Sequence, residues 1–158
     1  MSLTACGQGD YAEALRFGRQ GYELFEGLGH RWGMAASLCR IGFATLGLGR
    51  SAEARTRFLE ALRLAVRMRH VPLILYALSG MACLLAQEGE DEKAVELFAF
   101  IEQHPQTPPI YLAIVRRWFE DVETRLSEGA LAAARGRGKA SDLESVVEAV
   151  MKDGPAGS

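Results

Sequence analysis

Apolar residues recur at spacings of three and four along most of the chain, which is the pattern of amphipathic α-helices. Glycines and prolines separate the apolar segments, so the pattern predicts helices joined by short turns. The predicted helices cover residues 10–27, 32–48, 50–69, 72–87, about 91–104, 110–127 and 142–152. A further helix begins at 130–134 and is weakened by Gly136 and Gly138, because glycine disfavours a helix interior. The sequence therefore predicts an all-α protein.

A repeat of forty residues underlies this succession of helices. Two series of identical residues share the spacing: Gly9, Gly49, Gly89 and Gly129, and Ala14, Ala54, Ala94 and Ala134. The glycines predict tight turns, and each turn joins two helices into one unit. In the central unit, Gly42 and Ala54 are small enough for the two helices to approach closely, with Leu38 and Phe58 filling the space around them. One helix pair cannot bury its apolar face alone, so each unit predicts neighbours.

The repeat divides the chain into one domain over residues 1–152, with units near 9–48, 49–88 and 89–128 and a degenerate unit over 129–152. In the first unit, only the helix over 10–27 and the last turn of its predecessor fall within the sequence. A half unit leaves an apolar face open to water. We therefore expect either a fragment of a longer protein or self-association. A capping box over 141–144 begins the last helix, which closes the array, and residues 153–158 are expected to be disordered.

The unit resembles the two-helix repeat of the tetratricopeptide superfamily in its longer form. The resemblance rests on Leu38, Ile41, Gly42, the Gly49 turn, Ala54, Phe58 and Ala61. It implies a right-handed superhelix of about three helix pairs plus a capping helix. The spacing and the tail over 132–147 are similar to the C-terminal regions of bacterial signal-transduction ATPases with numerous domains, including the LuxR-type maltose regulators and antibiotic regulatory proteins. Gly18 and Gly21 depart from this pattern, which favours Phe and Ala there.

Composition and charge bound the possible functions. The formal net charge of −2 argues against a dedicated nucleic-acid binder. Arginines dominate the segment 50–69 and acids dominate 88–102, which indicates solvated faces of opposite charge, or less readily an anionic partner. No apolar run approaches the ~20 residues that span a bilayer. The N-terminus lacks the features of a secretory signal, so a cytoplasmic location is expected.

Residues able to carry chemistry are few. The three cysteines, Cys6, Cys39 and Cys83, have no close-spaced pairing that would indicate a disulfide framework or a metal site. His30 and His70 differ by the repeat length, and both fall in turns, so the repeat explains their spacing. No nucleophile is accompanied by a base, and no phosphate-binding loop is present in the sequence. We expect no enzymatic activity, no cofactor and no metal.

The family resemblance implies that the first helix of each pair lines a concave groove. The expected partner-binding positions are Cys39, Phe43, Tyr76, Ser79, Cys83, Arg116, Phe119 and Glu123. Aromatic side chains would anchor a peptide or partner helix there, and Arg116 would bind a carboxylate by two hydrogen bonds. The leading hypothesis is thus a protein-interaction or sensor module of a bacterial signalling or transcriptional regulator. Two alternatives stay open: a homodimer formed through helix 10–27, and a sensor of a small-molecule effector.

Overall fold

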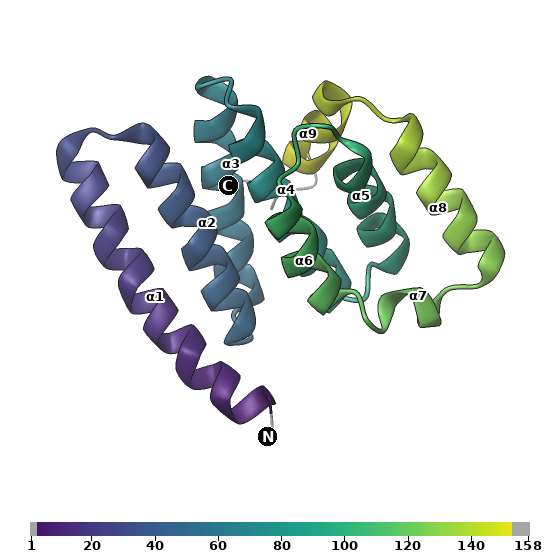
Figure 1. Cartoon of the computed structure of the whole chain (residues 1–158), viewed down its shortest axis with the longest axis horizontal. Helices are drawn as coiled ribbons and strands as arrows, with labels where there is room; N and C mark the ends of the chain where they lie inside the picture. Colours follow the sequence, from purple (N-terminus) through teal and green to yellow (C-terminus); the bar gives the residue numbers. More distant parts are fainter. Residues whose placement is uncertain (1–2, 153–158) are drawn as a thin grey trace. The chain divides into compact units, whose positions relative to one another are not determined.

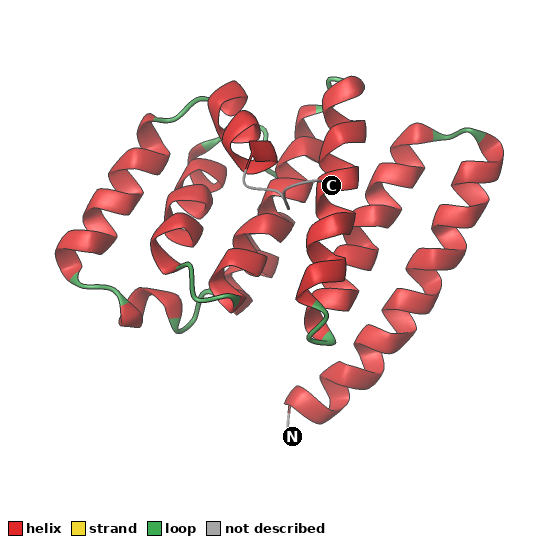
Figure 2. Cartoon of the chain, turned by 180° about the vertical axis from the view of Figure 1, so that it is seen from behind, coloured by secondary structure: helices red, strands yellow, loops and turns green. Residues whose placement is uncertain are grey.

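The computed structural model describes the backbone of residues 3–152 and the side chains of residues 9–152, and residues 153–158 lie outside it. Within residues 3–152 the chain forms nine helices and no strand, which confirms the all-α prediction (Figures 1 and 2). The helices are α1 (Leu3–Leu28), α2 (Arg31–Gly47), α3 (Ser51–Arg67), α4 (Val71–Gln87), α5 (Asp91–Gln103), α6 (Pro109–Trp118), α7 (Val122–Arg125), α8 (Glu128–Ala140) and α9 (Leu143–Lys152). Among these described helices, none combines the length and apolarity needed to cross a membrane.

The chain divides into two compact units, residues 1–77 and 78–158, and the division falls within α4. In the first unit, α2 lies between α1 and α3 and packs against both (Figure 1). In the second unit, α5 is the central helix and packs against α6, α7 and most extensively α8. The right-handed superhelix and the single-domain arrangement stay predictions.

Four turns of the same geometry recur at intervals of twenty residues. The residue with a positive φ is Gly29, Gly49, Arg69 or Gly89 in turn, with φ between 54° and 81°. In each turn, the amide of the next residue donates to a carbonyl five residues earlier, as His30 N does to Phe25 O over 2.9 Å. This is the Schellman motif, which satisfies carbonyls at a helix C-terminus. Three of the four sites have glycine because other residues adopt a positive φ at a cost.

Glycines also allow close helix packing in the first unit. A Cβ built on Gly42 would lie 2.5 Å from the ring of Phe58, which is fully buried, so α2 and α3 approach as the sequence predicted. On α1, a Cβ at Gly18 would lie 2.9 Å from the side chain of Ile41. This departure from the tetratricopeptide pattern thus has a local cause, because α1 lies close against α2 at that residue.

Two of the predicted turn glycines lie inside helices. Gly9 belongs to α1, which runs without a break from Leu3 to Leu28, so the expected turn before residue 10 was wrong. Gly129 is the second residue of α8, because Ser127 caps that helix: its Oγ accepts a hydrogen bond from Ala130 N over 3.1 Å. The repeat of forty therefore marks turns only at Gly49 and Gly89.

The helix expected over 110–127 is two shorter helices. α6 ends at Trp118, and α7 begins at Val122. Phe119 in the turn and Val122 at the start of α7 are 5% and 1% exposed, and the ring of Phe119 packs against Phe98 at 4.9 Å between centroids. Burying two side chains against α5 outweighs the continuation of one helix.

The C-terminal helices differ from the prediction in one detail, the cap of α9. α8 runs to Ala140 and includes the two glycines expected to weaken it, and Gly138 lies against the backbone of α5. The cap of α9 is Asp142 and not Ser141: Asp142 Oδ1 accepts from Ser145 N over 2.8 Å, which also lowers the pKa of Asp142. The helix expected over 142–152 is otherwise confirmed.

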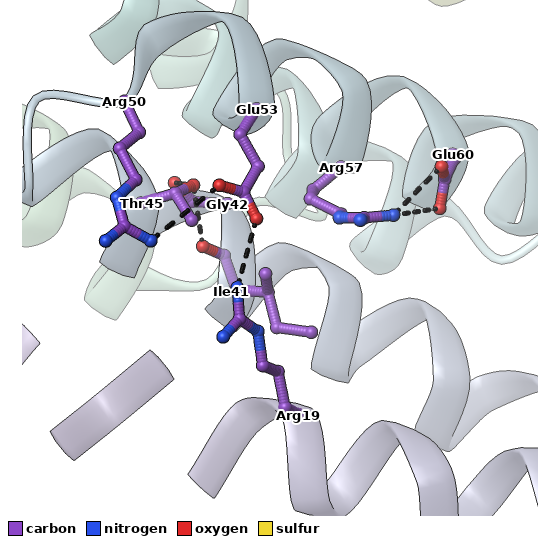
Figure 3. Close-up of polar contacts among 8 residues, drawn as sticks. All are labelled: Arg19, Ile41, Gly42, Thr45, Arg50, Glu53, Arg57 and Glu60. Atoms are coloured by element: carbon purple, nitrogen blue, oxygen red, sulfur yellow. Dashed lines mark hydrogen bonds and ion pairs between the residues drawn. The ribbon is translucent and has the colours of Figure 1, made fainter. Parts of the chain in front are cut away.

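Ion pairs of the first unit involve arginines of the basic segment. Glu53 on α3 forms ion pairs with Arg19 of α1 at 3.3 Å and with Arg50 at 3.9 Å (Figure 3). Arg57 pairs with Glu60 at 3.1 Å. The contact between Arg19 and Glu53 links the first and third helices across α2. Arg50 and Arg57 belong to the basic segment 50–69, and both pair with acids of the same unit at the surface. This pairing favours a solvated charged face over a site for an anionic partner.

In the second unit, the acids of α5, which fall in the segment 88–102, are paired with arginines that follow them in sequence. Asp91 binds Arg125 at 2.8 Å, Glu96 binds Arg137 at 3.0 Å, and Glu102 lies 3.6 Å from Arg116. Arginines from α6, α7 and α8 thus neutralise acids on α5. Hydrogen bonding from Arg125 lowers the pKa of Asp91, so this carboxylate is ionised in the folded protein.

Candidate protein-interaction surfaces

The eight predicted partner-binding residues fall into two groups by exposure. Cys39, Ser79 and Cys83 are 0% exposed and Phe119 is 5% exposed. The other four lie at least partly at the surface: Phe43 and Tyr76 are half-buried, and Arg116 and Glu123 are exposed. A buried side chain cannot contact a partner without repacking. Partner contact therefore stays a prediction for the four residues at the surface, Phe43, Tyr76, Arg116 and Glu123.

Phe43 and Tyr76 are brought together in the first unit. Phe43 on α2 stacks against Tyr76 on α4, with ring centroids 5.6 Å apart and an interplanar angle of 26°. Phe43 also contacts Phe58, with ring centroids 5.1 Å apart and an interplanar angle of 75°. The buried ring of Phe58 fixes Phe43, and Phe43 in turn supports Tyr76. The pair forms a rigid, half-exposed aromatic surface.

The predicted residues of the second unit have separate partners. Arg116 lies 3.6 Å from Glu102, and its side chain is 66% exposed. Glu123 pairs with Arg135 on α8 at 2.8 Å. A carboxylate ligand of Arg116 would therefore compete with Glu102, at a site where water weakens the ion pair.

The buried cysteines have no features of reactive thiols. Burial raises the pKa of Cys39 and of Cys83, so both thiols stay protonated near neutral pH. Nucleophilic attack and metal binding both need the thiolate, which burial disfavours. The Cys6 side chain lies outside the described residues.

The histidines in the turns cap helices. His30 Nδ1 accepts from Gly33 N over 3.0 Å at the start of α2, and His70 Nδ1 accepts from Leu73 N over 3.2 Å at the start of α4. Trp32 lies between them, with its ring centroid 6.4 Å from that of each histidine. Their shared capping role explains why the two histidines differ by one repeat. Among residues with described side chains, no three His, Cys, Asp or Glu form a group able to hold a metal ion.

An exposed apolar stripe on α1 is the main surface that the predicted residue set missed. It consists of Phe17, Leu24 and Leu28, which are 56%, 62% and 71% exposed, and we call it the α1 stripe. At about 100° per residue, these three side chains lie within about 40° of one another around the helix axis. The other face of α1 packs on α2 through Leu15 and Tyr22. The signal was present in the sequence as two apolar faces on one helix.

A cleft of about 420 Å³ lies between α9 and the helices α4 and α5. Its walls are mainly apolar: Leu85, Leu97, Val146, Ala149 and Val150 contribute, with Lys93, Glu96, Ser141 and Ser145 among the polar lining residues. No residue of α9 is buried, although its apolar side chains form one stripe. The helix covers this cleft without filling it.

Comparisons with protein-family models, curated proteins and solved structures found no match to this chain. The resemblance to tetratricopeptide repeats therefore rests on the residues of the sequence, and it enters the functional argument as a hypothesis.

Proposed function

We propose that this chain is a non-catalytic helical module that binds an amphipathic α-helix of another polypeptide. The observation that carries the proposal is the α1 stripe, whose three large apolar side chains are 56–71% exposed in line on one helix face. Spacings of seven and four residues between Phe17, Leu24 and Leu28 match the way in which a helix presents anchors to a second helix. Single exposed apolar residues are common on proteins, whereas a line of them is typical of an interface.

The charges beside the α1 stripe restrict the partner helix. Arg16 lies at one edge, 3.6 Å from Glu13, and its guanidinium carbon is 4.9 Å from the ring centroid of Phe17. Glu23, which is exposed, follows two turns later on the same side. A partner helix should therefore carry apolar residues at helical spacing, with an acid opposite Arg16 and a base opposite Glu23.

Selection from a displayed library of helical peptides tests the proposal. We expect selected peptides to bind the wild-type chain and to lose at least about tenfold in affinity on Leu24→Asp, because a charge then replaces a central anchor. Ala12→Asp is the matched control, since Ala12 is exposed on α1 but points about 120° away from Leu24. Equal affinity for the wild type and Leu24→Asp would refute the α1 stripe as the binding surface.

The Phe43–Tyr76 pair is the second candidate surface of the same function. Two stacked, half-buried rings supply a rigid anchor, and the family resemblance supports a groove on this side of the helix pairs. The wider assignment, to a cytoplasmic signalling or transcriptional regulator of bacteria, rests on that resemblance alone. Selected peptides that lose affinity on Tyr76→Ala, but keep it on Leu24→Asp, would favour this surface.

A small-molecule sensor is the second candidate function, and the cleft beneath α9 favours it. Its volume of about 420 Å³ falls within the usual range of ligand pockets. Decanoate is a suitable probe, because its chain matches the apolar walls and its carboxylate matches Lys93. A rise in melting temperature with decanoate that Ala149→Trp abolishes, by filling the cleft, would support this function. An identical rise in both proteins would contradict it.

A further inference from the structure

We infer that the helix bound by the α1 stripe is α1 of a second copy of this chain, in antiparallel orientation. The twofold axis of this pair passes between Gln20 and Gly21. The inference rests on the proposed function and names its partner. It follows from two properties of α1: the position of its apolar residues and the position of its charges.

The apolar residues match across this axis. When the axis lies between Gln20 and Gly21, Phe17 of one copy faces Leu24 of the other, and the reverse contact follows by symmetry. Leu28 of each copy then lies opposite Glu13 of its counterpart, with Ala14 in the same turn. Phe17 and Leu24, which are 56% and 62% exposed in one copy, thus each gain an apolar neighbour.

The charges select the antiparallel orientation. Arg16 and Glu23 are seven residues apart, about 10 Å along the helix, so they do not pair within one copy. Around the proposed axis, Arg16 of one copy comes within one helical turn of Glu23 of the other, and the contact occurs twice. A parallel pair would instead place these two residues of one copy on the opposite side of the interface from the same residues of the other, so Arg16 and Glu23 would not meet. The proximity of Arg16 to the Phe17 ring, 4.9 Å, places its charge beside the stripe.

Gly21 lies at the contact between α1 and α2, because a Cβ there would meet Ser37 Oγ on α2 at 3.2 Å. Gly18 lies at the same contact, with a Cβ there only 2.9 Å from Ile41. The α1 stripe is therefore fixed in orientation before any second copy binds, so little conformational entropy is lost on association.

Solution mass is the first test. Light scattering of the full chain over a dilution series should give a mass that rises toward twice the monomer value as the protein concentration increases. Leu24→Asp should keep the mass at the monomer value over the same range, and Ala12→Asp should behave as the wild type. A wild-type mass that stays monomeric, or an equal loss of dimer in both variants, would overturn the inference.

Crosslinking tests the position of the axis. In a Cys6→Ser background, Gln20→Cys places a thiol beside the axis, while Cys39 and Cys83 are 0% exposed and should not react. Mild oxidation should convert most of this variant into a covalent dimer on a non-reducing gel. Ala12→Cys is the control and should stay monomeric. Equal crosslinking of both variants would exclude the proposed axis.

Charge exchange tests the antiparallel contact and separates the two proposals. Arg16→Glu or Glu23→Arg alone should weaken the dimer about tenfold or less, and the double variant should recover most of the loss. No recovery would contradict the contact between Arg16 and Glu23. If the wild type is monomeric but displayed helices still bind through Leu24, the interaction function stands and only self-pairing fails.

Discussion

Gly136 and Gly138 lie two residues apart in α8, and the same substitution at each should change stability in opposite directions. A Cβ at Gly136 would meet nothing within 4 Å, whereas a Cβ at Gly138 would overlap the carbonyl oxygen of Glu96 and lie 2.9 Å from the side chain of Ala99. The obstructing atom at Gly138 belongs to the backbone of α5, so no rotamer change can relieve the overlap. α8 and α5 would have to move apart.

The magnitudes follow from helix propensity and packing. Gly136→Ala should stabilise the protein by about 1 kcal/mol, the usual gain from replacing glycine in a helix interior. Gly138→Ala gains the same amount but adds an overpacking cost of about 1–3 kcal/mol, and a backbone clash belongs at the upper end of that range. We expect a net loss of about 1–2 kcal/mol, which places the two variants about 2–3 kcal/mol apart.

Urea unfolding can follow the second unit by itself, because Trp118 lies in it and Trp32 lies in the first unit. In a Trp32→Phe background, the fluorescence of Trp118 should show a higher midpoint for Gly136→Ala and a lower midpoint for Gly138→Ala. A Gly138→Ala protein as stable as its parent would refute the close approach of α8 to α5. A destabilised Gly136→Ala protein would refute the open environment of that residue.

Three further predictions concern a turn, a buried hydroxyl and an ion pair. Arg69 has a φ of 54°, so Arg69→Gly should raise the free energy of unfolding by about 0.5–1 kcal/mol. Gly49 has a φ of 79°, so Gly49→Ala should lower it by about 1 kcal/mol; thermal unfolding measures both changes. Ser37 Oγ is buried and has no hydrogen-bond partner among the described residues; Ser37→Ala should therefore stabilise by about 1 kcal/mol in urea unfolding, and a loss would mean that the hydroxyl is satisfied. Hydrogen bonds from Arg125 lower the pKa of Asp91 below its ordinary value of 3.8, so this pair contributes stability above pH 3.8 that is lost as the pH falls further. Arg125→Gln should accordingly be less stable than wild type at pH 7, and the difference should shrink in acid; a difference that is constant with pH would contradict the assignment.

Most helices were predictable because their signals are local. Residues 32–48, 72–87 and 142–152 carry apolar spacing and end at glycine, proline or a capping residue, and the structure places helices there within one residue. The same reasoning failed at residues 110–127, where no glycine or proline marks the break. Burial of Phe119 and Val122 against α5 ends α6 there, and no local pattern contains that information.

The interaction surfaces show the same limit. Spacing placed Cys39, Ser79 and Cys83 on first helices of the repeat, but burial within the chain removes all three from the surface. Phe17 and Leu24 were visible as apolar residues of helix 10–27, yet spacing alone did not show that they face solvent while Leu15 faces α2.

The sequence by itself determined the helices, the turns at Gly49 and Gly89, and the small residue at Gly42 that admits Phe58. These features depend on backbone conformation and side-chain size within a few residues of one another. Only the tertiary structure decided which face of α1 is covered, where α6 ends, and which arginines neutralise α5. Those outcomes depend on contacts between segments far apart in the chain, and an apolar or charged residue has the same local signature whichever segment it meets.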